Sequence, residues 1–136
     1  MVLTRFELSF DGNPQGVGMF QGLTDVGMPN HQYSRILDLF EQLPSPYIDM
    51  RDEAFDHIDG DTLSFWFTPA GVKRFSGAIR ELRRAISDYG WELLKAEIDD
   101  EYVDPIYEDA YQMAVPVGQA KNLMPKFKKY KGGTQE

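Results

Sequence analysis

The stretch from Thr62 to Ile98 constrains the fold more than any other part of the chain. Thr68 is a favoured N-cap, Pro69 suits the first helical position, and Gly90 suits the left-handed residue that follows a helix. Between them, apolar residues recur at spacings of three and four, as they do along the buried side of a helix. These residues are Val72, Phe75, Ile79, Leu82, Ile86 and Tyr89. The spacing predicts one long helix over residues 69–89.

Alternating apolar residues before and after this helix predict two strands, at 62–67 and 91–98. The same alternation predicts strands at 2–10 and 110–117, and a second amphipathic helix is predicted over 30–43. The resulting order, β-α-β-α-β-β, predicts a single α+β domain. We expect about four strands in a mixed or antiparallel sheet, with two helices packed on one face.

Charge is distributed unevenly along the 136 residues, whose net charge is −8. Residues 121–136 contain five lysines and one glutamate, a charge of +4, which leaves −12 on the first 120 residues. We therefore divide the chain into an acidic α+β domain, 1–118, and a basic flexible C-terminal tail, 119–136.

Three absences from the sequence indicate a cytoplasmic protein. Cysteine is missing, which fits a reducing compartment. The first residues do not place a basic n-region before an apolar run, as a signal peptide would. No apolar run approaches the ~20 residues that a membrane-spanning helix needs. We therefore expect no contact with a membrane.

Two acidic stretches, within residues 47–61 and 99–109, are the main candidates for a binding surface. Tyrosines alternate with acids in and after the second stretch, at Tyr102, Tyr107 and Tyr111. Tyrosines in a negative surround suit recognition of a basic protein, whereas edge-strand tyrosines with acids that oppose edge pairing are the alternative explanation. The predicted protein-binding residues are Asp52, Glu53, Asp56, Asp99, Asp100, Glu101, Tyr102, Asp104, Tyr107, Glu108 and Asp109.

A basic face on the long helix is a second candidate surface. On a continuous helix Lys73, Arg80 and Arg84 would project within about 40° of one another, opposite the apolar side. They are predicted as a weak site for an anion, with counter-charge for the acidic loops of the same molecule as the alternative. The Gly-rich stretch 14–28 is predicted as a loop or a weak hairpin, which would add one or two strands.

Catalytic and metal-binding motifs are not recognisable. His31 and His57 lie outside any histidine motif, and the G-x-S-x-G elbow of a serine nucleophile is absent. The glycines at Gly16 and Gly18 lack the remaining spacing of a phosphate-binding loop, and the acids from Asp56 onward do not follow the EF-hand order. We therefore predict no catalytic residue, no metal and no cofactor, and a function other than catalysis.

Three functional hypotheses follow. The first is a small inhibitor whose acidic, nucleic-acid-like surface occupies a nucleic-acid-binding protein, as anti-CRISPR, anti-restriction and nuclease-immunity proteins do; its body would not bind nucleic acid itself. The second is a small-ligand-binding protein or enzyme that uses the stretch 14–28 and the basic face of helix 69–89. The third is a homodimer in which a second copy covers Leu3 or Trp66, both expected to be exposed on the sheet.

Overall fold

The computed structural model describes residues 1–10, 13–43 and 63–131. Its strands form one sheet in which every pairing is antiparallel. The order across the sheet is β5-β6-β3-β1-β4-β7, and β2 pairs with β1 beside this path. The strands are β1 (Val2–Phe10), β2 (Asn13–Gly18), β3 (Leu63–Phe67), β4 (Trp91–Asp99), β5 (Tyr107–Glu108), β6 (Gln112–Pro116) and β7 (Lys128–Lys129).

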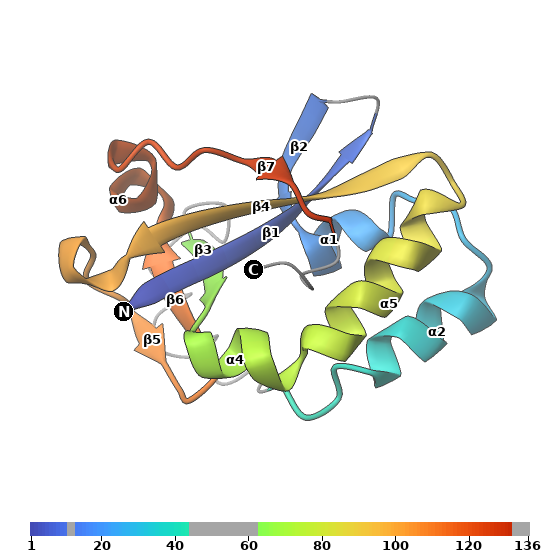
Figure 1. Ribbon diagram of the computed structural model, residues 1–136, viewed down its shortest axis with the longest axis horizontal. Helices are drawn as coiled ribbons and strands as arrows, with labels where there is room; N and C mark the ends of the chain where they lie inside the picture. The colour runs from blue at the N-terminus through green and yellow to red at the C-terminus, as the bar shows by residue number, and fades with distance from the viewer. Residues whose placement is uncertain (11–12, 44–62, 132–136) are drawn as a thin grey trace.

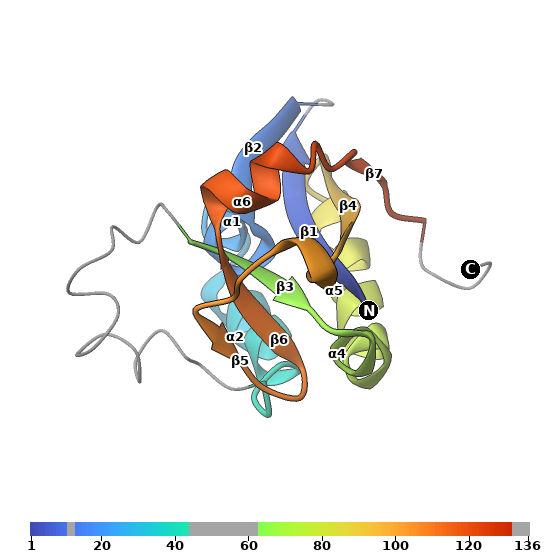
Figure 2. The ribbon, with the colours of Figure 1, turned by 90° about the vertical axis from the view of Figure 1, so that its left-hand side faces the viewer.

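Helices lie on both sides of this sheet (Figures 1 and 2), so the expectation of two helices packed on one face is wrong. They are α1 (Met19–Leu23), α2 (Asn30–Asp38), α4 (Pro69–Arg74), α5 (Ser76–Ser87) and α6 (Val117–Asn122), together with the short 3₁₀ helix η2 (Asp100–Tyr102). None of the helices in the described part of the chain is long and apolar enough to span a membrane.

The α+β class is confirmed, and the sheet is antiparallel. The four predicted strands are present as β1, β3, β4 and β6, but the estimate of about four strands is wrong. Strand β2 lies in the stretch where an additional β-element was expected. Strands β5 and β7 are two residues long, which is too short to produce a periodic sequence signal.

The long helix predicted over 69–89 is divided in two at Phe75, whose backbone angles are φ −106° and ψ 15°. Thr68 caps α4 as expected, because its side chain accepts a hydrogen bond from the Gly71 N–H. At the break, the Phe75 ring packs against Phe40, Phe67 and Tyr111, with centroids 5.8, 6.3 and 5.5 Å away. The helix is therefore interrupted at the residue whose ring makes these contacts with other elements.

The first hydrophobic core lies between the sheet and helices α1, α2, α4 and α5. The predicted apolar side of α5 faces it, through Ile79, Leu82 and Ile86. The even-numbered residues Phe6 and Leu8 of β1 reach the same core. Burial of this side stabilises the helix by about 25 cal/mol per Å² of apolar surface removed from water, well beyond its intrinsic propensity.

A second core lies on the opposite face of the sheet, beneath α6 and η2. Leu3 and Trp66 are 0% and 2% exposed here, so the expectation that they are exposed is wrong. They pack with Val103, Ala120 and other apolar residues of the same chain. The sequence pattern placed Leu3 and Trp66 on the correct face but did not reveal that the chain returns to cover it.

Residues 119–131 differ from the flexible tail expected from 119 onward. Ala120 of α6 is buried in the second core, and β7 pairs with Leu94 and Lys95 of β4. Tyr130, just after β7, is 8% exposed and packs edge-to-face on Phe6, with ring centroids 5.3 Å apart. Apolar side chains placed among the lysines therefore attach this basic segment to the sheet.

Candidate functional site

Residues 99–109, here called the acidic segment, run from the last residue of β4 through β5 into the turn before β6. The segment lies beside the N terminus in Figure 1, and β5 forms one edge of the sheet. Between Lys95 and Lys121 the chain contains seven aspartates and glutamates and neither lysine nor arginine. The acidic segment carries six of the seven.

Backbone contacts hold the acidic segment in place. Val103 is buried in the second core, and the Asp104 N–H donates a 2.7 Å hydrogen bond to Oε1 of Gln119 in α6. The Ile106 N–H donates a 2.8 Å hydrogen bond to the Ala114 carbonyl. The segment is thus anchored from both the core and α6, so its carboxylates are presented on a structured support.

Asp99 and Asp100 take part in internal contacts. Oδ1 of Asp99 accepts a 3.0 Å hydrogen bond from the Glu101 N–H and thereby caps η2. Oδ1 of Asp100 lies 2.6 Å from the Met1 ammonium. This hydrogen bond, with the negative charge of Asp100, Asp99 and Glu101, raises the pKa of the Met1 amine above its ordinary value. Part of the negative charge is therefore neutralised within the molecule.

Asp109 organises the turn between β5 and β6. Its Oδ1 accepts hydrogen bonds from the Tyr111 and Gln112 N–H groups at 2.7 and 3.0 Å. Its Oδ2 accepts a 2.6 Å hydrogen bond from the Tyr107 hydroxyl. These hydrogen bonds give Tyr107 and Asp109 a structural role in the turn that needs no partner protein. An aspartate commonly accepts hydrogen bonds from N–H groups two and three residues later in the chain.

Apart from Asp99, which caps η2, the exposed residues of the acidic segment with charged or aromatic side chains are Glu101, Tyr102, Asp104 and Glu108. Tyr102 is 67% exposed, the most of any aromatic side chain in the described residues. Across residues 1–10, 13–43 and 63–131, no cation forms an ion pair with Glu101, Asp104 or Glu108. We call these four residues the acidic edge. The other predicted binding residues Asp52, Glu53 and Asp56 lie outside the described residues.

The predicted basic face is spread over two helices. Lys73 lies in α4, whereas Arg80 and Arg84 lie in α5, and all three are exposed. The Arg84 guanidinium forms a 3.1 Å ion pair with Glu81 in the same helix. Such an exposed pair contributes little to stability and partly neutralises the face.

The Gly-rich stretch 14–28 contributes to the sheet and to the first core. Its beginning belongs to β2, which pairs with β1. Further along, Met19, Leu23, Val26 and Met28 are buried. Burial of these four side chains in the first core explains why the stretch contains more apolar residues than an ordinary loop.

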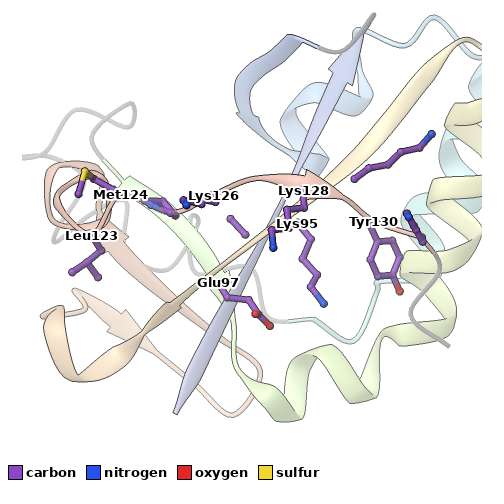
Figure 3. Close-up of a pocket in the computed structure, with 11 residues that line it drawn as sticks. Lys95, Glu97, Leu123, Met124, Lys126, Lys128 and Tyr130 are labelled. Atoms are coloured by element: carbon purple, nitrogen blue, oxygen red, sulfur yellow. The ribbon is translucent and has the colours of Figure 1, made fainter. Parts of the chain in front are cut away.

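A groove lined by lysines was missed by sequence reasoning. It runs along the outer edge of β4, next to residues 123–131, and its lining includes Lys95, Lys126, Lys128 and Lys131 (Figure 3). The signal that could have found it is the spacing of Phe127 and Tyr130 within the basic run, because a fully solvated tail has no need for aromatic residues.

Within the described residues, no group of three or more histidine, cysteine, aspartate or glutamate side chains is arranged to hold a metal ion. Comparison with models of protein families, with curated proteins and with solved structures found no match to this chain. The acidic edge and the lysine groove are therefore the two candidate functional surfaces.

Proposed function

We propose that the protein binds a basic partner protein through the acidic edge and inhibits the binding of nucleic acid by that partner. The observation that carries the proposal is the run of seven acidic residues without a lysine or arginine. Four of them, Glu97 and the three carboxylates of the acidic edge, are exposed and form no ion pair among the described residues. Exposed carboxylates repel a phosphate backbone and attract the basic surface that would otherwise bind it.

Tyr102 supplies the apolar contact that a purely charged surface lacks. Complementary charge mainly accelerates association and selects the partner, whereas an aromatic side chain desolvated in the centre of an interface contributes strongly to affinity. Tyr102 follows Glu101 and is 67% exposed, so a partner can bury it while contacting the neighbouring carboxylates. Inhibitors of the anti-CRISPR and anti-restriction type, and immunity proteins against nucleases, are versions of this function that differ only in the partner.

The test uses a variant in which the acidic edge is neutralised by Glu101→Gln, Asp104→Asn and Glu108→Gln. These side chains take no part in the capping and turn contacts of Asp99 and Asp109. We expect the wild-type protein to capture a basic nucleic-acid-binding protein from a lysate, with binding that weakens as salt screens the charges. We expect the variant to lose this capture, and the purified partner to regain its nucleic-acid binding.

The matched control carries the same change in charge on the helical side, through Asp38→Asn, Glu41→Gln and Asp88→Asn, all at exposed positions. If net charge alone drives capture, both variants will fail equally. Capture by the edge variant at the wild-type level would contradict the proposal.

A further inference from the structure

The lysine groove brings a strong positive charge to one edge of an acidic protein. It has a volume of about 800 Å³ and opens along β4 where the chain passes from α6 to β7 (Figure 3). This volume lies in the range of small-molecule sites, about 300–1,000 Å³. Five lysines line it, and they are Lys95, Lys126, Lys128, Lys129 and Lys131.

Among the described residues, Lys129 is the one lysine of the five that has a carboxylate partner. Lys129 forms a 2.8 Å ion pair with Glu92, and Glu97 is the acidic residue of the lining. In the part of the chain that the structure describes, no carboxylate forms an ion pair with Lys95, Lys126, Lys128 or Lys131. Like charges along one groove repel one another, and an anion bound among them relieves the repulsion.

The backbone that carries these lysines is fixed in position. The Tyr130 N–H donates a 2.8 Å hydrogen bond to the Leu93 carbonyl, and Nε of Arg83 donates a 2.9 Å hydrogen bond to the Tyr130 carbonyl. The Tyr130 ring is buried against Phe6. Because this backbone is already ordered, an anion would bind without the entropic cost of ordering a mobile tail.

We propose that the lysine groove binds a short polyphosphate, such as the triphosphate moiety of a nucleotide or an inorganic polyphosphate. Lysine binds phosphate oxygens as a compact point charge. The Lys95 ammonium lies 5.9 Å from the centroid of the Tyr130 ring, and this buried ring offers no free face on which a base could stack. A polyanion that extended along the whole groove would meet the Glu97 carboxylate, which repels it.

Titration calorimetry of the full chain with sodium tripolyphosphate tests the proposal directly. We expect saturable one-to-one binding, weakened about tenfold for each ammonium removed in Lys126→Gln and Lys128→Gln, since each supplies a charge-assisted contact. The matched control, Lys73→Gln with Arg80→Gln, removes two charges from the predicted basic face and should leave the affinity within about twofold. Absence of binding by the wild type, or a larger loss in the control, would overturn the proposal.

Amide chemical shifts of the wild-type protein supply a second readout that needs no variant. Tripolyphosphate should shift the amides of Lys95, Lys128 and Tyr130, and a response confined to α5 would overturn the site. An oligothymidylate strand serves as the second ligand. Affinity that rises steadily with its length beyond that of tripolyphosphate would overturn the preference for a short anion.

The acidic-edge variant should bind tripolyphosphate as the wild type does, and the lysine variant should retain capture of the basic partner. Either proposal can therefore fail in its own experiment while the other proposal still passes its own.

Discussion

Arg83 in α5 donates a 2.9 Å hydrogen bond through Nε to the carbonyl of Tyr130, a residue 47 positions later in the chain. The contact ties the helical layer to the segment that follows β7, at the edge of the sheet where the lysine groove opens. The position of the groove lysines thus depends on a helix that contributes none of them.

Arg83→Met keeps much of the aliphatic packing and removes this hydrogen bond. We expect a loss of about 1 kcal/mol in the free energy of opening the Tyr130 segment. Native-state hydrogen exchange at the Tyr130 amide, which is bonded to Leu93, measures that opening. Arg84→Met is the control, because the Arg84 side chain is 74% exposed and pairs with Glu81. Equal exchange rates in the two variants would show that Arg83 does not restrain the segment.

Gly71 permits the close approach of α4 to the start of β6. A Cβ atom at this position would collide with the Tyr111 carbonyl oxygen, which is backbone and cannot rotate away. We expect Gly71→Ala to lower the free energy of unfolding by about 1–3 kcal/mol, as overpacking does, despite the better helix propensity of alanine. Urea denaturation measures the change.

Gly77 is the matched control for this substitution, because a Cβ atom there meets nothing within 4 Å. In α5, Gly77→Ala should raise the free energy of unfolding by about 0.5–1 kcal/mol through propensity alone. Stabilisation of both variants would mean that α4 can move away from Tyr111 at little cost.

Trp66 depends on a short polar chain inside the second core. Its Nε1–H donates a 2.8 Å hydrogen bond to Oγ of Ser64, whose hydroxyl donates to the Val115 carbonyl at 3.0 Å. Ser64→Ala should lower the free energy of unfolding by about 1–3 kcal/mol, because the buried indole N–H loses its acceptor.

Ser87→Ala is the control, because the Ser87 hydroxyl is exposed and bonded to the Arg84 carbonyl. It should change the free energy of unfolding by less than about 0.5 kcal/mol. Thermal unfolding of both variants distinguishes the outcomes, and similar midpoints would contradict the prediction.

The Met1 amine should contribute to pH-dependent stability. Its hydrogen bond to Asp100, with the negative charge of Asp100, Asp99 and Glu101, raises the pKa of the amine above 8.0 in the folded protein. A raised pKa stabilises the fold at pH values below 8, and this contribution is lost as the pH rises through the folded-state pKa. Asp100→Asn should lower the amine pKa and reduce this dependence.

The proton shift of the Met1 α-hydrogen, followed between neutral and alkaline pH, reports the amine pKa. Asp104→Asn leaves the hydrogen bond to Asp100 intact and serves as the control. Equal pKa values of the Met1 amine in wild type and Asp100→Asn would show that the hydrogen bond between Met1 and Asp100 does not form in solution.

Local periodicity was sufficient to predict β1, β3, β4 and β6, the α+β class and the apolar side of α5. Each of these elements repeats its burial pattern over several residues, as Ile79, Leu82 and Ile86 do. The cap at Thr68 was equally local, since its side chain bonds to an N–H three residues away. The acidic segment was likewise visible as a run of like charges. The sequence did not separate the carboxylates that cap η2 or order the turn from those of the exposed acidic edge. That separation depends on where Met1, Gln112 and Tyr107 lie in the structure.

Only the tertiary structure decided the break at Phe75, the burial of Leu3 and Trp66, and the place of the basic C-terminal segment. Phe75 contacts rings from distant parts of the chain, and Leu3 and Trp66 are covered by Val103 and by residues that follow β6. Strand β7 is two residues long and exists because Tyr130 packs on Phe6 and bonds to Leu93. Composition alone determined that the segment is basic. Long-range packing of one aromatic residue decided that its lysines line a groove, because burial of that ring overcomes the entropy and charge repulsion that would otherwise leave the segment free.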